Sequence, residues 1–276
     1  GNTCVFARDV NFLSLGSLCE RARVSIIHMG TYKLASLVHA TAHGRGKLPS
    51  FTGILAGGSR VPGQLRKKVK ALLTDNLWVL YATSEAGMIS LAPPDQHEMF
   101  PEGVGSPAAD VTVEIVGPNG EVLGPGEVGR IRIRKATMTS GYVSEPSAST
   151  NFRDGWFYPG DLLSRTEGGP LIYHDRVDDV MILNGINIFP GAIEDALESH
   201  PDVLEAVAYA IKSQIHGEIP VAAVVLSEQA QNRDTSHLLD HCRQLLGMRG
   251  PRQIRVIESI PRNAAGKPLR RELARS

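Results

Sequence analysis

Helix-like and strand-like patterns alternate through the first 95 residues, and this alternation constrains the fold more than any other feature. Apolar periodicity predicts helices over residues 12–23, 31–43 and 61–73, and strands over residues 24–29, 51–59 and 77–85. Strands that alternate with helices favour a parallel α/β sheet, which binds ligands beyond the carboxyl ends of its strands. The first strand reads as buried. The stretches AGGS and YATSE form the C-terminal ends of the other two predicted strands.

The pattern changes after about Pro93 to a period of two. Residues 110–116, 127–134 and 155–162 alternate apolar and polar side chains between turn sequences such as GPNG. They predict a small antiparallel sheet or barrel, with a hairpin over residues 111–123. From about Asp178 the chain reads as a compact α+β unit, in which a polar turn, NGINIFPG, precedes a helix at 192–200.

Composition excludes several classes of protein. The 29 basic and 29 acidic residues cancel, so no net positive charge recruits nucleic acid or a membrane surface. No apolar run approaches the roughly 20 residues of a membrane helix, and the first residues do not resemble a secretion signal. The three cysteines are too scattered for a disulfide framework, which favours a cytoplasmic location.

Two stretches at predicted turns carry acidic groups. In YATSE, the hydroxyls of Thr83 and Ser84 and the carboxylate of Glu85 could hold Mg²⁺ and phosphate; alternatively, a hydroxyl there caps a helix. In GWFYPGDL, Asp161 could accept hydrogen bonds from a ribose diol, or it is an ordinary turn residue.

Two further stretches combine basic groups with glycine. In DRVDDVMILNG, the guanidinium of Arg176 stands next to Asp178, and Gly185 marks a sharp turn or a close approach to a ligand. The alternative is a salt-bridged connector between domains. In AAGKPLRREL, Lys267 lies on a glycine-hinged loop that could reach an anion, or it belongs to a solvated basic tail.

Two histidines on one predicted helix could be taken for a metal site. His237 and His241 stand four residues apart on a predicted helix, but the sequence contains no HExxH motif and no second ligand cluster. We therefore favour two surface histidines over a metal site. His28, in the apolar stretch IIHMGTY, reads as a packed histidine rather than a catalytic base.

Together, in this order, these stretches resemble the adenylate-forming superfamily, which includes acyl- and aryl-CoA synthetases, peptide-synthetase adenylation domains and luciferase-like enzymes. The resemblance covers the whole chain and is carried by YATSE, YPGDL, RVDDVMILNGINIFPGAIE and NAAGKPLRREL. It implies an α/β fold in which residues 1–177 are part of a large domain and residues 178–276 are a mobile C-terminal domain. The large-domain part would divide into an α/β subdomain, 1–95, and a β-barrel-like subdomain, 96–177.

The resemblance also implies a function, that of an acid–thiol ligase. ATP and Mg²⁺ would convert a carboxylic acid to an acyl-adenylate, and CoA would then displace AMP. Lys267 would bridge the carboxylate and the α-phosphate, Glu85 would bind Mg²⁺, and Ser84 would lie near the α-phosphate. The nucleotide would contact Gly57, Gly58, Ser59, Tyr81, Thr83, Asp161 and Arg176. Asp178 would be the hinge, and Gly185 would line the pantetheine tunnel.

The chain departs from the family pattern in one major respect. The phosphate-binding loop that ends in Pro-Lys-Gly is absent from these 276 residues. We expect a C-terminal portion of a longer enzyme, inactive by itself, whose full-length form could be a homodimer. Ala82, Pro159, Asp175 and Asn184 also stand where glycine, threonine, glycine and glycine are usual.

The apolar stretch around His28 favours a fatty or aromatic acid as the substrate. Two other classes stay open. One is an amino-acid adenylation domain of a peptide synthetase. The other is a non-catalytic remnant that binds a nucleotide or a partner.

Overall fold

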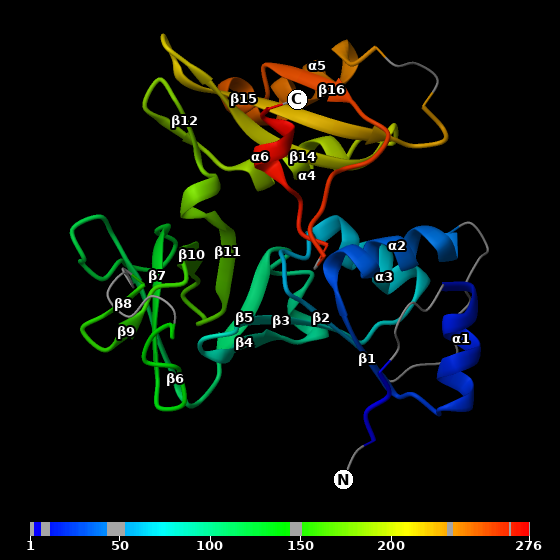
Figure 1. Ribbon diagram of the computed structural model, residues 1–276, viewed down its shortest axis with the longest axis vertical. Helices are drawn as coiled ribbons and strands as arrows, with labels where there is room; N and C mark the ends of the chain where they lie inside the picture. The colour runs from blue at the N-terminus through cyan, green and yellow to red at the C-terminus, as the bar shows by residue number, and fades with distance from the viewer. Residues whose placement is uncertain are drawn as a thin grey trace. The chain divides into compact units, whose positions relative to one another are not determined.

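A computed structural model describes residues 3–6, 12–42, 53–143, 151–230, 234–264 and 266–275. The chain forms two compact units. The first consists of Gly1–Val113, Ile133–Ser147 and Arg165–Ile172, and the second of Glu114–Arg132, Ala148–Ser164 and Tyr173–Ser276. Figure 1 labels the helices and strands.

The first unit contains the predicted parallel sheet. Strands β1 (Ile26–Gly30), β2 (Gly53–Gly57) and β3 (Leu77–Thr83) pair in parallel, and helices α2 (Thr31–Ala42) and α3 (Gly63–Leu72) connect or follow them. Helix α1 (Phe12–Arg21) precedes β1. The alternation of strand and helix is therefore confirmed.

Two antiparallel strands extend this sheet. Strand β4 (Gly87–Ala92) follows β3 through a tight turn, and β5 (Gly103–Pro107) pairs with β4 after a short 3₁₀ helix η1 (Pro94–Gln96). The sequence interpretation did not foresee β4.

Two expectations for β1 were wrong. The strand is not buried, because Ile26 is 63% exposed. Its side chains alternate, so His28 points to the same side as Ile26 and is exposed rather than packed. In the described part of the chain β1 pairs with β2 alone and is an edge strand.

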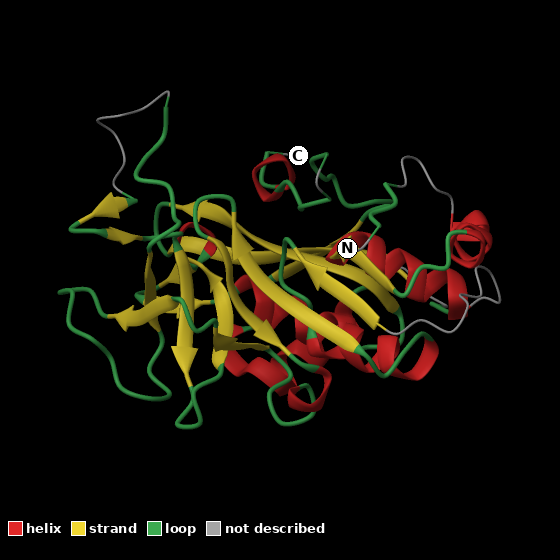
Figure 2. Cartoon of the chain, turned by 90° about the horizontal axis from the view of Figure 1, so that it is seen from below, coloured by secondary structure: helices red, strands yellow, loops and turns green. Residues whose placement is uncertain are grey.

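Between Gly103 and Arg176 the described residues form strands and turns and no helix (Figure 2). The strands after β5 are β6 (Val111–Val116), β7 (Gly129–Lys135), β8 (Phe152–Arg153), β9 (Trp156–Phe157), β10 (Asp161–Arg165) and β11 (Leu171–Arg176). The hairpin over residues 111–123 is confirmed, because Val116 pairs with Val122 and the amide of Gly117 donates to the carbonyl of Glu121.

The C-terminal part of the second unit is an antiparallel sheet with helices. Its strands are β12 (Met181–Leu183), β13 (Ile186–Ile188), β14 (Val203–Ser213) and β15 (Gly217–Leu226), in the order β13-β12-β15-β14, and β16 (Gln253–Val256) pairs in parallel with β15. The helices are α4 (Pro190–Glu198), α5 (Ser236–Leu246) and α6 (Arg270–Leu273), with 3₁₀ turns η2 (Val177–Asp179) and η3 (Gly247–Arg249).

Alternation along β14 builds a core on each face of this sheet. Ala206 and Ala208 belong to the cluster that includes Ile193 of α4 and Leu238 of α5. Val207 and Tyr209 point the other way, into a smaller cluster closed by Leu273 of α6. The short α6 is thus anchored to the sheet through its last residue.

The segment predicted as one polar turn, NGINIFPG, contains a strand. Asn184 and Gly185 have φ angles of 50° and 81° and form a two-residue hairpin turn between β12 and β13. Asn-Gly is the preferred sequence for such turns, which need positive φ at both positions. Helix α4 then begins at Pro190, earlier than predicted, because proline is well suited to the first helical position.

Candidate functional site

The loop after β2 exposes its backbone beside β3. A Cβ on Gly57 would lie 2.9 Å from the carbonyl oxygen of Leu80, so only glycine fits there without displacing β3. Gly58 has a φ of +86° with open space around its Cβ position, and the hydroxyl of Thr31 donates to the carbonyl of Ser59 at 3.0 Å. The two predicted ligand-facing strand ends are neighbours, since Gly57 pairs with Leu80.

The end of β3 turns directly into β4. Tyr81 is buried, and the hydroxyl of Thr83 accepts a hydrogen bond from the amide of Ala86 at 3.1 Å. Ser84 and Glu85 lie in the turn, where Ser84 is exposed and Glu85 is half-buried. The alternative in which a hydroxyl here caps a helix is wrong, because a strand follows.

The carboxylate of Glu85 is oriented by a tyrosine that the sequence analysis missed. The phenol of Tyr142 donates to Oε1 of Glu85 at 2.7 Å, and the amide of Thr139 donates to the carbonyl of Glu85 at 2.8 Å. Tyr142 lies 57 residues downstream and outside every motif, so no sequence signal connects the two. The phenol uses one of the carboxylate's acceptor sites and leaves others for a cation. The donor set fits Mg²⁺, which binds one or two carboxylates and keeps several waters.

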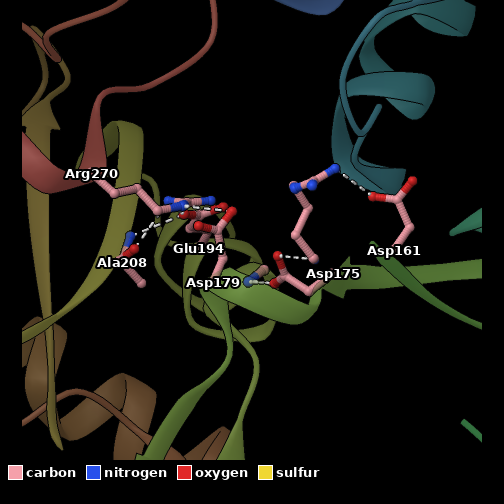
Figure 3. Close-up of polar contacts among 8 residues, drawn as sticks. Asp161, Asp175, Asp179, Glu194, Ala208 and Arg270 are labelled. Atoms are coloured by element: carbon pink, nitrogen blue, oxygen red, sulfur yellow. Dashed lines mark hydrogen bonds and ion pairs between the residues drawn. The ribbon is translucent and has the colours of Figure 1, made fainter. Parts of the chain in front are cut away.

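Asp161 and Arg176 form the clearest pair among the predicted residues. Asp161 is 6% exposed at the start of β10, and its Oδ1 accepts from Nη1 of Arg176 at 3.1 Å (Figure 3). The carbonyl of Gly160 accepts from the amide of Val177 at 2.9 Å, which holds the two strand ends together. Each carboxylate oxygen carries two acceptor sites, so a carboxylate that accepts from a guanidinium can also accept hydrogen bonds from a diol.

Asp175, noted in the sequence only as a departure, links β11 to α4. Its carboxylate accepts from the amide of Arg176 at 3.0 Å and from the amide of Gly191 at 2.9 Å, in the first turn of α4 (Figure 3). Burial raises the pKa of Asp175 to about 6, and the nearby charge of Glu194 adds to that effect. The two amide hydrogen bonds and Arg270 oppose it.

Arg270 forms a second polar cluster around α4. Its guanidinium pairs with the carboxylate of Glu194 and donates to the carbonyl of Ala208 at 3.0 Å, and its Nε lies 3.8 Å from Oδ2 of Asp179 (Figure 3). These contacts connect the end of the chain to α4, β14 and η2. The sequence RREL shows that this part of the chain is charged. It does not identify the partners of Arg270, which lie 62 to 91 residues upstream in the sequence.

The turn that carries Lys267 is pinned by its own backbone and by Arg262. The amide of Lys267 donates to Oδ1 of Asn263 at 2.9 Å, and the amide of Asn263 donates to the carbonyl of Lys267 at 3.0 Å. Arg262 donates to the carbonyl of Gly266 and to Glu205, each at 2.9 Å. Lys267 itself is exposed. The solvated-tail alternative is wrong for Arg262 and Arg270, which are both held in ion pairs.

The remaining predicted residues occupy turns. Asp178 is exposed in η2, directly after the Asp161–Arg176 pair, and Gly185 is in the β12–β13 turn. Within the second unit, the structure therefore brings Asp161 and Arg176 together next to Asp178. Within the first unit it brings Gly57–Ser59 next to the end of β3.

Two protein-family models match this chain. Residues 1–143 match the model of the AMP-binding enzyme family, and residues 192–267 match the model of the AMP-binding enzyme C-terminal domain. The chain belongs to the AMP-binding enzyme family, also called the adenylate-forming superfamily.

Named relatives and solved structures agree with this assignment. A 2-succinylbenzoate–CoA ligase of Geobacillus kaustophilus is 32% identical over 82% of this chain and 46% of its own length. A long-chain-fatty-acid–CoA ligase of Salmonella typhimurium is 29% identical over 79% of this chain and 39% of its own. Among structures, an amide bond synthetase of Marinactinospora thermotolerans matches 96% of this chain and 55% of its own, with a TM-score of 0.88 and 29% identity.

Another similar structure contains a reaction intermediate. It is an o-succinylbenzoate CoA synthetase of Bacillus subtilis in complex with an acyl-adenylate, 27% identical with a TM-score of 0.82, over 96% of this chain and 54% of its own. The chain thus spans about half the length of the relatives it matches. The predicted fold class is confirmed. In the described residues no helix is long and apolar enough to cross a membrane.

Proposed function

We propose that this chain supplies the ribose-binding and lysine-bearing parts of an enzyme that activates a carboxylic acid with ATP and transfers the acyl group to CoA. The buried Asp161, held by Arg176 at 3.1 Å, carries the proposal. A desolvated carboxylate makes strong hydrogen bonds to neutral donors, which suits two adjacent ribose hydroxyls.

The adenine would lie against the loop after β2. The backbone is open at Gly58, where nothing lies within 4 Å of the Cβ position, and the ring of Tyr81, from the neighbouring β3, would stack on the base. Thr83 fixes the turn that follows. Together these residues would set the position of the nucleoside.

The phosphates and Mg²⁺ would lie at the β3–β4 turn. Glu85, oriented by Tyr142, would be the metal ligand, and the exposed Ser84 would donate to the α-phosphate. Mg²⁺ would supply neutralisation of the phosphate charge, while the side chains fix the position of the α-phosphorus.

Lys267 would act between the carboxylate of the acid and the α-phosphate of ATP, which are both negatively charged. In the first step an oxygen of the acid attacks the α-phosphorus and pyrophosphate leaves, and the ammonium of Lys267 would stabilise the charge that gathers there. In the second step the sulfur of CoA attacks the acyl carbonyl, AMP leaves, and the thiol proton is released. Lys267 is not needed for that step.

The C-terminal domain would begin at Asp178 and move between the two steps. The exposed Asp178 in η2 suits a hinge, and a rotation there would break the hydrogen bond from the amide of Gly191 to the buried Asp175. In the second step Gly185 would line the path of the pantetheine arm. We place the domain boundary between residues 177 and 178.

The acid is fatty or aromatic in this proposal. The end of β1 pairs with the loop-bearing β2, so Met29 and Gly30 lie beside Ala56 and Gly57. An apolar wall suits a hydrocarbon better than an amino acid, whose ammonium would need a carboxylate partner. The names of the Geobacillus and Salmonella relatives fit an aromatic and a fatty acid respectively.

A chimera tests the function. This chain would be joined behind the phosphate-loop-bearing half of the Geobacillus ligase, and acids would be screened by pyrophosphate exchange and by thioester formation with CoA. We expect exchange by the chimera and none by the 276 residues alone, because they contain no Pro-Lys-Gly loop for the β- and γ-phosphates. Robust exchange by the 276 residues alone, or none by the chimera with any acid, would contradict the proposal.

The same experiment would also test an amine as the acceptor of the acyl group. The similarity to an amide bond synthetase favours an amine as the group that displaces AMP. If the chimera forms amides from amines and no thioester from CoA, the acceptor is an amine. The first step, formation of the acyl-adenylate, would be the same.

A further inference from the structure

Three histidines and an aspartate from two separate segments converge near the end of α4. His200 and Asp202 lie in the connection between α4 and β14, and His237 and His241 lie on α5. One ligand atom from each of His200, Asp202 and His237 lies within 4.8 Å of the others. The cluster contains none of the residues assigned above to the nucleotide, its metal ion or the lysine turn.

The spacing of these groups is close to that of a metal site. Nε2 of His237 lies 3.1 Å from Oδ2 of Asp202, and the rings of His200 and His237 are 5.1 Å apart between centroids. Ligand atoms of a tetrahedral zinc ion are about 3.3 Å apart, given metal–ligand bonds of about 2.0–2.2 Å. The His237–Asp202 pair already has this spacing, and side-chain rotation can bring His200 closer.

His241 positions the cluster rather than joining it. Its Nε2 donates to the carbonyl of Ala196 at 3.1 Å and lies 2.9 Å from the hydroxyl of Ser199, so it fastens α5 to the end of α4. Its ring stands edge-on to that of His200 at 5.2 Å. The His200 ring therefore lies between the imidazoles of His237 and His241.

Binding of a metal ion would disrupt little of the existing structure around His200. Nδ1 of His200 accepts from the amide of Asp202 at 3.2 Å. Coordination through Nε2 would move the ring proton to Nδ1 and give up this long hydrogen bond. His200, Asp202 and His237 are all partly exposed, so an ion can enter and water can complete its coordination.

We propose that His200, Asp202 and His237 bind a divalent transition-metal ion of the zinc class. Two imidazoles and one carboxylate are ligands for Zn²⁺, Co²⁺ or Ni²⁺, whereas Mg²⁺ prefers an all-oxygen shell. The bound ion cross-links the α4–β14 connection to α5 and stabilises this part of the second unit. The i, i+4 histidines were noted in the sequence, but the other two ligands, Asp202 and His200, lie 35 and 37 residues upstream of His237, where spacing alone cannot connect them.

Cobalt and zinc titrations test the site. The tag-free chain, freed of metal by a chelator, would be titrated with Co²⁺ by visible absorption and with Zn²⁺ by calorimetry in excess Mg²⁺. We expect one equivalent of each, with Co²⁺ bands typical of nitrogen and oxygen ligands. His237→Gln and Asp202→Asn should each weaken Zn²⁺ binding at least tenfold. His216→Gln is the matched control, since His216 contacts Asn184 and lies outside the cluster.

Two readouts separate ligand loss from misfolding. The metal-free variants should show the wild-type circular dichroism spectrum, and Zn²⁺ should raise the melting temperature of the wild type but not of His237→Gln. Asp202→Asn keeps the side-chain shape and repeats the test independently. Zn²⁺ binding that survives both substitutions would overturn the proposal. So would a thiolate charge-transfer band, which would place the ion at the exposed Cys4.

Discussion

Arg176 approaches Asp161 over a glycine, at a position that a side chain would crowd. A Cβ on Gly160 would lie 3.0 Å from Nη2 of Arg176, and Gly160 has a φ of +82°. The guanidinium therefore reaches Oδ1 of Asp161 at 3.1 Å across a position where an added methyl group would be both strained and crowded.

Gly160→Ala should weaken AMP binding about tenfold or more, because the new methyl displaces the guanidinium that holds Asp161. Gly155→Ala is the matched control: Gly155 has a φ of +73° but nothing within 4 Å of its Cβ position. Each substitution should lower the free energy of unfolding by about 1–2 kcal/mol through backbone strain. Calorimetry with AMP measures the difference, and equal affinities for the two variants would contradict the proposed ribose site.

Tyr142→Phe should raise the Mg²⁺ concentration needed for half-maximal pyrophosphate exchange by the chimera. The phenol orients the carboxylate of Glu85 at 2.7 Å, and loss of such a partner of a metal ligand typically costs about 10–100-fold in affinity. Glu85→Gln should abolish the Mg²⁺ response. An unchanged Mg²⁺ dependence in Tyr142→Phe would remove Tyr142 from the metal site.

Asp175→Asn should make stability less dependent on pH. Because burial raises the pKa of Asp175 to about 6 from an unfolded value near 4, the folded state binds this proton more tightly. The contribution of Asp175 to folding is therefore most favourable below pH 4 and is lost as the pH rises through 6. The stability of Asp175→Asn relative to the wild type should rise by about 3 kcal/mol between pH 4 and pH 7. Urea unfolding at several pH values measures the stability difference between Asp175→Asn and the wild type. A difference that does not change with pH would contradict the raised pKa of Asp175.

Arg270→Met should lower the free energy of unfolding by about 2–4 kcal/mol, because it leaves Glu194 without its cation and the carbonyl of Ala208 without a donor. Arg271→Met, at the exposed neighbouring position, should change stability by less than about 0.5 kcal/mol. A double-mutant cycle with Glu194→Gln isolates the pair, and a coupling near zero would contradict its structural role.

Local sequence patterns predicted most of the fold and singled out Asp161 and Arg176, which the structure brings together in an ion pair. Periodicity located β2, α3 and β7 because their buried faces repeat every two or every three to four residues. The Asp161 turn and the Arg176 strand end were found because turn and motif residues are local features. The Tyr142–Glu85 and Arg270–Glu194 contacts were missed because each joins segments more than 50 residues apart. His28 was misassigned since periodicity does not show which strand lies at a sheet edge.

The role of Lys267 is the centre of the account, and one comparison tests it. In the chimera, pyrophosphate exchange and thioester formation from preformed acyl-adenylate would be measured for the wild type and for Lys267→Ala, with Arg271→Ala as the control. We predict a loss of at least about a thousandfold in exchange, a thioester rate within about tenfold of the wild type, and no change in the control. Equal losses in both steps, or exchange that survives the substitution, would contradict the account.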